Sequence, residues 1–364
     1  MPTFFIILFG VYLSGNVYIF IRGWQAISGL PLGIKIMLSI LFWIGALSFL
    51  SILKLRDSNV PETIGHLVYE IGTGWLIFTL YMVLLLLVVD IFKLFHVQYA
   101  YSFYVVLGFT LCLLSYGYYN YRHPKTTTVD LVINKPVDIP SSQLKVIAIS
   151  DIHLGYGTNK SILKEYVSYI NKQNPDIIII GGDLIDSSVT PLYKEQMDEE
   201  LSQLNAPLGV YMALGNHEYI SGLQASLDFL KKTPITLLQD RIITLPNQVQ
   251  IIGRDDRSSR HRKPLHELIK SIDLTKPTIL LDHQPYNLEE VSNAGIDLQF
   301  SGHTHRGQVW PMSWVTDKLF EVSYGYKQKG NTHFYISSGL SLWGPPFRIG
   351  TVSELVVFNI TFES

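Results

Sequence analysis

Two histidines lie two residues apart near the end of the sequence, in the segment SGHTHRGQ at residues 301–308. Imidazole side chains bind divalent metal ions and transfer protons near neutral pH, so His303 and His305 could do either. Side chains two apart on an extended segment point to the same side, and we expect each ring to reach one of two neighbouring ions. Gly302, which has no side chain, would let the backbone come close to that site.

Side chains of the kinds that bind metal ions also follow four earlier apolar runs, each where a predicted strand ends. Together with the strand end at His303 and His305, this gives five strand ends. The residues at the four earlier ends are Asp151 and His153, Asp183, Asn216 and His217, and His283. Ligands of open α/β sheets bind beyond the carboxyl ends of the strands. A single aspartate or asparagine there is typical of a turn or a helix cap. Five such ends together predict one metal site at the edge of the sheet.

The types of these side chains narrow the choice of metal. Carboxylates, an amide oxygen and imidazoles, without a thiolate, suit Mn, Fe, Zn, Co or Mg. The one cysteine of the chain, Cys112, lies in an apolar run and cannot form an internal disulfide or a thiolate cage. The set is too large for one ion, so two ions that share a carboxylate fit better. A site of that kind suits displacement at phosphorus.

Apolar and amphipathic segments alternate after residue 143 and would position these side chains. Short apolar runs predict strands at 145–150, 176–182, 209–215, 277–283, 297–303, 333–340 and 353–360, and a hairpin over 242–253. Helical spacing predicts helices at 161–173, 191–204, 223–233 and 265–272. Alternating strands and helices predict an α/β sandwich with the helices outside the sheets.

The first third of the chain has a different composition. Four apolar runs, each close to the ~20 residues that cross a bilayer as a helix, lie at 3–21, 34–53, 71–92 and 99–119. The first run has neither a basic start nor a small-residue cleavage site, which argues against a removable signal peptide. The alternative is a soluble helical bundle, but four such runs joined by polar segments favour four membrane spans.

Four crossings would leave the N-terminus and the α/β part on the same side of the membrane. Basic residues near the spans on that side are Lys54, Arg56, Arg122 and Lys125, against Arg22, Lys35 and Lys93 on the other side. The positive-inside rule therefore favours a cytoplasmic α/β part. Residues 121–130 are interpreted as the linker out of the membrane.

The strand-end motifs together resemble one protein family. The segments DIHLG, GGDLID, GNHE, LDHQP and GHTHRGQ occur in the order that is typical of the calcineurin-like metallophosphoesterase family. The resemblance covers residues 143–360, and within the family it is similar to the membrane-associated bacterial branch with GHTHxGQ. It implies a two-sheet sandwich flanked by helices, preceded here by a four-span α-helical region outside the family's catalytic core.

The resemblance also implies a role for each residue of the cluster. Asp183 would bridge two ions, and His217 would face the phosphate and protonate or stabilise the leaving oxygen. The other ligands would be Asp151, His153 and His305 for one ion, and Asn216, His283 and His303 for the other.

Several further residues have two interpretations. Arg306 stands where many relatives of this branch have glycine, and it is interpreted either as a phosphate or headgroup contact or as an exposed loop arginine. Arg254 and Arg348 are weaker substrate-contact candidates, and Arg254 could instead pair with a nearby acid. Asp186 and Glu218 could orient ligand histidines, although ordinary capping or surface charge is the favoured interpretation of Glu218.

These observations predict an integral-membrane, metal-dependent phosphoric ester hydrolase of a bacterial inner membrane. We divide the chain into a transmembrane region (1–121), a linker with the first strand (122–143) and a metallophosphoesterase domain (144–364). The short linker favours a lipid-linked substrate, while monoester, diester and pyrophosphate bonds stay open. The alternatives are a catalytically inactive metal-binding membrane sensor or scaffold, and a transporter with an accessory phosphoesterase. A net charge of −2 disfavours a nucleic-acid partner.

Overall fold

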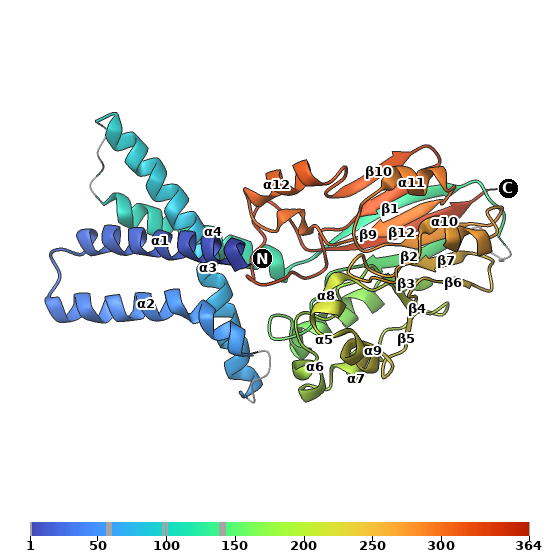
Figure 1. The fold of residues 1–364 in the computed structure, drawn as a ribbon, viewed down its shortest axis with the longest axis horizontal. Coiled ribbons are helices and arrows are strands. Elements are labelled where there is room, and N and C mark those ends of the chain that lie inside the picture. Colours follow the sequence, from blue (N-terminus) through green and yellow to red (C-terminus); the bar gives the residue numbers. More distant parts are fainter. Residues whose placement is uncertain (1, 56–59, 97–98, 100, 138–142, 364) are drawn as a thin grey trace. The chain divides into compact units, whose positions relative to one another are not determined.

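The computed structural model describes the chain except for residues 1, 56–59, 97–98, 100, 138–142 and 364 (Figure 1). Arg56 and the side chain of Lys54, both used in the charge argument above, lie outside the described part. The chain forms two compact units. The first comprises residues 1–119 and 344–349, and the second comprises residues 120–343 and 350–364.

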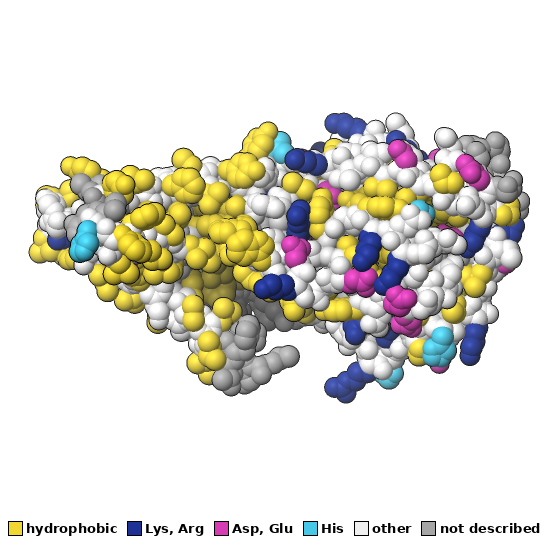
Figure 2. Space-filling view, turned by 90° about the horizontal axis from the view of Figure 1, so that it is seen from above, with side chains coloured by type: hydrophobic (Ala, Val, Ile, Leu, Met, Phe, Trp, Pro, Cys, Tyr) yellow, Lys and Arg dark blue, Asp and Glu magenta, His cyan; other side chains and the backbone are white. Residues whose placement is uncertain are grey.

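Four long helices make up most of the first unit. They are α1 (Pro2–Ala26), α2 (Leu32–Leu55), α3 (Glu62–Leu94) and α4 (Ser102–Arg122). Each is long and apolar enough to cross a membrane, which confirms the four apolar spans, although α3 has 33 residues and begins nine residues before the predicted run at 71–92. Large apolar side chains such as Val11, Ile40, Leu67 and Phe109 face outward, and Figure 2 shows hydrophobic side chains crowded over this unit.

A short segment from late in the chain, residues 344–349, packs within this helical unit. The backbone N–H of Arg348 donates to the carbonyl oxygen of Gly117 in α4 at 2.9 Å. A Cβ atom at Gly117 would lie 2.6 Å from Ile349, and one at Gly74 in α3 would lie 3.5 Å from the ring of Phe347. The missing side chain at Gly117 is therefore what lets this segment lie against α4.

The linker predicted over 121–130 is wrong. Helix α4 runs to Arg122, and strand β1 (Lys125–Ile133) begins after only two residues. It pairs in parallel with β12 (Glu354–Phe362) along its whole length. Threonine and valine in this segment favour a strand, and its first half is polar because it lies at the exposed end of an edge strand.

Two mixed sheets of six strands form the second unit and confirm the α/β two-sheet sandwich. The first sheet has the order β1, β12, β2 (Gln143–Ile149), β3 (Ile177–Ile180), β4 (Val210–Met212), β5 (Ile235–Leu237). The second has the order β10 (Gly325–Lys329), β11 (Thr332–Ile336), β9 (Leu298–Ser301), β8 (Thr278–Leu281), β7 (Gln250–Gly253), β6 (Arg241–Thr244).

Alternation along the strands builds the core between the sheets. Val146 and Ala148 of β2 point inward and meet Leu298 and Phe300 of β9 in one buried cluster. Their neighbour Ile147 points outward, under the helices of the first sheet. Because successive side chains of a strand point to opposite faces, one run of apolar residues supplies two cores.

Helices cover the outer faces of both sheets (Figure 1). The first sheet carries α5 (Lys160–Asn171), α6 (Thr190–Lys194), α7 (Met197–Leu201) and α9 (Leu223–Leu230), and the second carries α10 (Leu265–Leu268), a short 3₁₀ turn η1 (Ile269–Ser271) and α11 (Leu288–Asn293). The single helix predicted over 191–204 is wrong, because Gln196 adopts a left-handed conformation (φ 54°) that separates α6 from α7. The sequence patterns above do not predict the short α8 (Asn216–Ile220), helices α11 and α12 (Met312–Leu319), or strands β5 and β10.

Candidate metal centre

The carboxyl ends of five strands meet at one edge of the sandwich. Strands β2, β3 and β4 are parallel neighbours in one sheet, and β8 and β9 are parallel neighbours in the other. Parallel strands end at the same edge, so the loops that follow them converge there. The structure thus brings together the side chains of all eight residues that the sequence placed at strand ends.

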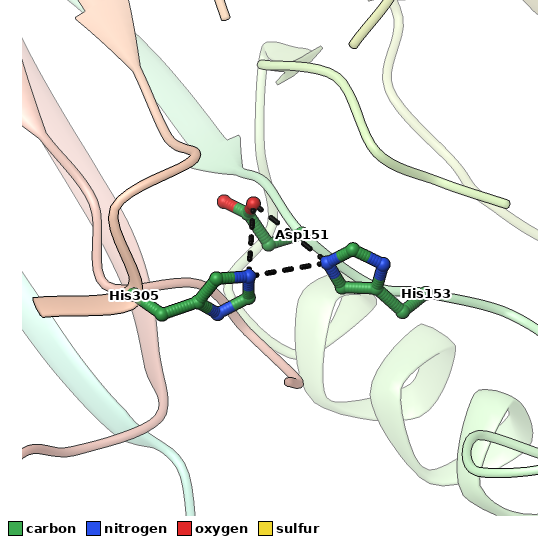
Figure 3. A group of neighbouring side chains, drawn as sticks. All are labelled: Asp151, His153 and His305. Atoms are coloured by element: carbon green, nitrogen blue, oxygen red, sulfur yellow. Dashed lines mark hydrogen bonds and ion pairs between the residues drawn. The ribbon is translucent and has the colours of Figure 1, made fainter. Parts of the chain in front are cut away.

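Asp151, His153 and His305 form the first group of potential ligands (Figure 3). Nε2 of His305 lies 3.4 Å from Oδ1 of Asp151 and 3.2 Å from Nε2 of His153. Nε2 of His153 lies 3.8 Å from the same Asp151 oxygen. Three donor atoms of buried residues that converge in this way could hold a divalent ion.

Asp183, His283 and His303 form the second group. Oδ2 of Asp183 lies 3.0 Å from Nε2 of His283, and Oδ1 of Asn216 lies 3.2 Å from the same nitrogen. Nδ1 of His283 lies 2.7 Å from the carbonyl oxygen of Gly181. When Nδ1 carries the proton and donates to that carbonyl, the Nε2 lone pair is directed at the other ligands, an arrangement common for metal-binding histidines.

Asp183 lies between the two groups. Its Oδ2 is 3.9 Å from Nε2 of His153, so one carboxylate reaches histidines of both groups. Its Oδ1 accepts the backbone N–H of His217 at 2.8 Å. Nδ1 of His217 in turn lies 3.0 Å from the carbonyl oxygen of Asp186 and 3.3 Å from its Oδ1. His217 is thereby held beside the group that joins both sets of ligands.

Left-handed backbone conformations recur in the loops of this site. The φ angles are 55° at Asp151, 50° at His153, 52° at Asp183, 72° at His303 and 47° at His305. Each costs on the order of 1–3 kcal/mol for residues with a side chain, and such residues cluster at functional sites. Hydrogen bonds between the loops hold them, such as Asp151 N–H to Gly182 and His153 N–H to Asp183.

The extended conformation expected for GHTHRG is wrong. Strand β9 ends at Ser301, and a 3₁₀ turn, η2, spans His305–Gly307. The positive φ angles at both histidines turn their rings apart, so that His303 joins the second group and His305 the first. A Cβ atom at Gly302 would lie 2.2 Å from Oδ2 of Asp151, so a glycine is needed where this loop crosses the loop after β2.

Glu218 has a positioning role, but it holds backbone N–H groups and not the ligand histidines that the sequence suggested. Its buried carboxylate accepts the backbone N–H groups of Gly215 at 2.7 Å, Ile185 at 3.0 Å and Asp183 at 3.1 Å. The capping interpretation is confirmed by the bond to Gly215, the residue before α8, whereas surface charge is wrong. The glutamate at the third position of the helix is the sequence signal for the cap, because its side chain can reach back to the N–H of the residue before the helix. No local pattern indicates the bonds to Asp183 and Ile185.

Known proteins resemble this chain in sequence. Residues 144–307 match the calcineurin-like phosphoesterase family. An uncharacterized metallophosphoesterase of Helicobacter pylori (strain J99) is 32% identical over 264 residues, which span 70% of each chain. The chain belongs to the calcineurin-like metallophosphoesterase family. A Danio rerio transmembrane protein with a metallophosphoesterase domain is 31% identical over 69% of this chain and 61% of that protein.

Among solved structures, a 5′-nucleotidase precursor from Thermus thermophilus aligns with 18% identity and a TM-score of 0.32, over 45% of this chain and 42% of that chain. The family is metal-dependent, and in this metallophosphoesterase the residues grouped above could bind the metal.

Burial and neighbouring charges set the protonation of two histidines of this metallophosphoesterase in opposite directions. Burial and the nearby His283 lower the pKa of His303 to about 4. Burial also disfavours a charged His217, but the hydrogen bond with Asp186 and the charge of Asp183 outweigh it and raise the pKa of His217 to about 9. Near neutral pH the neutral form of His303 and the protonated form of His217 are therefore favoured.

The three arginines predicted as substrate contacts have other neighbours in the structure. Arg254 is buried and donates to Oδ2 of Asp282 at 3.2 Å, which is the acid pairing considered above. The guanidinium carbon of Arg306 lies 4.9 Å from the ring centre of Tyr324. Arg348 is fully buried and belongs to the helical unit. A role of these arginines in substrate binding stays a prediction.

Proposed function

We propose that this chain is an integral-membrane phosphoesterase that uses two divalent metal ions to hydrolyse a phosphate ester or pyrophosphate bond. The observation that carries the proposal is the place of Asp183, whose Oδ2 lies 3.0 Å from His283 in one ligand group and 3.9 Å from His153 in the other. A carboxylate shared by two neighbouring groups suits a pair of ions better than a single ion.

Each group supplies a coordination set for one ion. One ion would take Asp151, His153 and His305, and the second would take Asn216, His283 and His303, with Asp183 common to both. Mn, Fe, Zn, Co or Mg would fit these oxygen and nitrogen donors. When bound, two such ions lower the pKa of water and offset charge on phosphoryl oxygens.

His217 is the proposed acid for the leaving group. Its Nδ1 faces the carbonyl oxygen and carboxylate of Asp186, at 3.0 and 3.3 Å. When Nδ1–H donates to Asp186, the ring is held in one orientation and Nε2 is left to carry the proton that the leaving oxygen needs. Asp186 is therefore a positioning residue, and Glu218 holds the backbone on which Asp183 stands.

The membrane setting supports a lipid-linked substrate. We propose a transmembrane region (1–121), a connecting segment with the first strand (122–143) and a metallophosphoesterase domain (144–364), with the domain on the cytoplasmic side of a bacterial inner membrane. The excess of basic residues near the ends of the spans on the domain's side supports this orientation. Strand β1 begins two residues after α4, so the domain is tethered at the end of a candidate span. A lipid-linked substrate would be close to a domain tethered in this way.

The deciding experiment combines metal content with turnover. Purified full-length protein with added Mn is screened on nucleotides, sugar nucleotides and phospholipids, beside Asp183→Asn and the control Asp228→Asn, which changes an exposed aspartate of α9. In the native protein and in the control we expect about two ions per chain and hydrolysis of at least one substrate. In Asp183→Asn we expect loss of the bound metal and of hydrolysis. Bound metal without turnover on any substrate would instead support a sensor or scaffold.

A further inference from the structure

Helix α12 exposes an unusual number of large apolar side chains for a helix of the α/β unit. We call the residues Trp310, Met312, Trp314, Val315 and Leu319 the α12 surface. Their exposed fractions are 43%, 41%, 61%, 45% and 67%, so all five residues are exposed. Contiguous exposed apolar surface marks sites that bind a membrane or another protein.

An ordinary surface helix buries its apolar face, whereas the large apolar side chains of α12 lie on its exposed side. Ser313 is its one buried residue, and the hydroxyl of Thr316 donates to the carbonyl oxygen of Ser313 at 2.9 Å. Asp317 accepts a hydrogen bond from Ser323. Ser313 thus faces the protein, while the large apolar side chains are exposed together with Asp317 and Lys318. Burial in the protein core therefore does not explain the apolar residues of this helix.

The positions of the tryptophans in the chain indicate which kind of partner would bind the α12 surface. Three of the six lie in the candidate spans, and the other three, Trp310, Trp314 and Trp343, all lie exposed in the α/β unit. Tryptophan is the side chain that concentrates at the boundary between membrane and water, because its ring is apolar and its N–H is polar. Lys318, exposed on the same outward arc of α12, adds a charge suited to anionic headgroups.

The chain connects the α/β unit, and with it the α12 surface, to helices that could cross a bilayer. The α/β unit is joined to the helical unit at three points, between residues 119 and 120, 343 and 344, and 349 and 350. Trp343 directly precedes the segment 344–349, which packs against α3 and α4. The α/β unit is therefore tied to the candidate spans from both β1 and Trp343, which restricts it to the neighbourhood of the membrane that those spans would cross.

The α12 surface also borders the candidate metal centre. A Cβ atom at Gly307, in the turn that begins with His305, would lie 2.4 Å from the backbone of Met312. At the other end of α12, the ring centre of Phe320 lies 6.1 Å from that of His303. Both ends of the helix thus pack against the loop that carries His303 and His305.

We infer that the α12 surface binds the headgroup boundary of the bilayer that α1–α4 cross, and that it holds the edge of the sandwich with the candidate metal centre at the lipid surface. This inference goes beyond the proposed hydrolysis, since it concerns where the α/β unit docks and holds whatever the reaction is. Its occupant is a lipid surface, and a second protein molecule is the competing occupant.

The test uses full-length protein in lipid nanodiscs that contain anionic lipid. Single-cysteine variants Trp314→Cys and Leu319→Cys, in a Cys112→Ser background, carry an environment-sensitive fluorophore. Lys172→Cys, an exposed position just beyond the end of α5, is the matched control, and native Cys112, exposed on α4, is the reference for a lipid-facing position. Quenching is measured with lipids that carry a nitroxide near the headgroup and with aqueous iodide.

We expect the labels at positions 314 and 319 to emit at shorter wavelength than at 172, to lose intensity with nitroxide lipid, and to be protected from iodide. Equal water exposure at 314, 319 and 172, in protein with an unchanged thermal midpoint, would overturn the inference. So would protection from both quenchers together with energy transfer between differently labelled copies, which would identify a second protein molecule. None of these readings depends on turnover, so failure of the proposed hydrolysis is detected separately.

Discussion

Oδ2 of Asp183 lies 3.0 Å from Nε2 of His283, across the junction of the two sheets. Asp183 follows β3 of the first sheet, and His283 follows β8 of the second. Both side chains are almost fully buried, so the pair must share a proton or a cation to offset the cost of a buried charge. The two sheets are therefore joined at this edge by groups that a metal ion would satisfy.

His303 and His305 should each control a different ion. The two residues belong to separate ligand groups, so His303→Ala and His305→Ala should each reduce the metal content from two ions to one per chain, as measured by elemental mass spectrometry. His261→Ala, at an exposed position, is the control and should keep both ions. Loss of both ions or of neither in the two single variants would contradict separate sites.

His217→Asn should impair the chemical step without removing metal. A general acid contributes about 10²–10⁴-fold to the rate, and we expect a fall in kcat of that order, with an unchanged number of bound ions. Steady-state kinetics on the substrate found in the screen, together with metal analysis, provide the check. A kcat close to that of the native protein would remove His217 from the proposed role.

The metal-free protein should contain two histidines, His217 and His303, that titrate far apart. Histidine-selective NMR should place the pKa of His217 at about 9 and that of His303 at about 4. Asp186→Asn should lower the first value and leave the second in place, because the hydrogen bond and charge of Asp186 help to raise the pKa of His217. Similar pKa values for His217 and His303 would contradict the hydrogen bond and charge that Asp186 is proposed to provide to His217 but not to His303.

The raised pKa of His217 also has a consequence for stability. A histidine whose pKa is higher in the folded than in the unfolded state stabilises the fold fully below the unfolded value of 6.5, and this contribution disappears as the pH rises through about 9. The thermal midpoint of the metal-free native protein should therefore fall between these two pH values by more than that of His217→Asn.

Gly302→Ala should damage the site although it adds one methyl group. The new carbon would lie 2.2 Å from Oδ2 of Asp151 and 2.6 Å from Oγ of Ser150, so the loop must shift. Crowding of this kind costs about 1–3 kcal/mol, and we expect a lower thermal midpoint and loss of metal. Gly108→Ala is the matched control because nothing lies within 4 Å of its Cβ position. Equal behaviour of the two variants would show that the loop is not crowded.

Glu218→Gln should loosen the loop that carries Asp183. The glutamate accepts three backbone N–H groups, and an amide can accept with only one of its two end atoms, so at least one buried donor loses its partner. Each such loss costs about 1–3 kcal/mol. Thermal unfolding should detect the change, with the exposed Glu267→Gln as control. An unchanged midpoint in Glu218→Gln would argue against this role.

Much of the site was accessible from the sequence because its ligands stand at the ends of apolar strands. A fully apolar run such as residues 177–180 is stable only as a buried strand inside a sheet. The parallel pairing of β2, β3 and β4 then brings Asp151, Asp183 and Asn216 to one edge. The four spans were equally accessible, because length and hydropathy decide membrane crossing without reference to the rest of the fold.

The sequence by itself determined the four apolar spans, the class of the fold and the set of ligand-type residues, because each depends on local apolar patterning and side-chain chemistry. Only the tertiary structure decided the backbone geometry that sorts these ligands into groups. His303 and His305 diverge because positive φ angles, held by hydrogen bonds from loops far away in the chain, override the extended geometry of their segment. The same holds for Glu218 and Arg254, whose partners lie on other strands and loops. A local pattern does not specify hydrogen bonds between segments that meet only after folding.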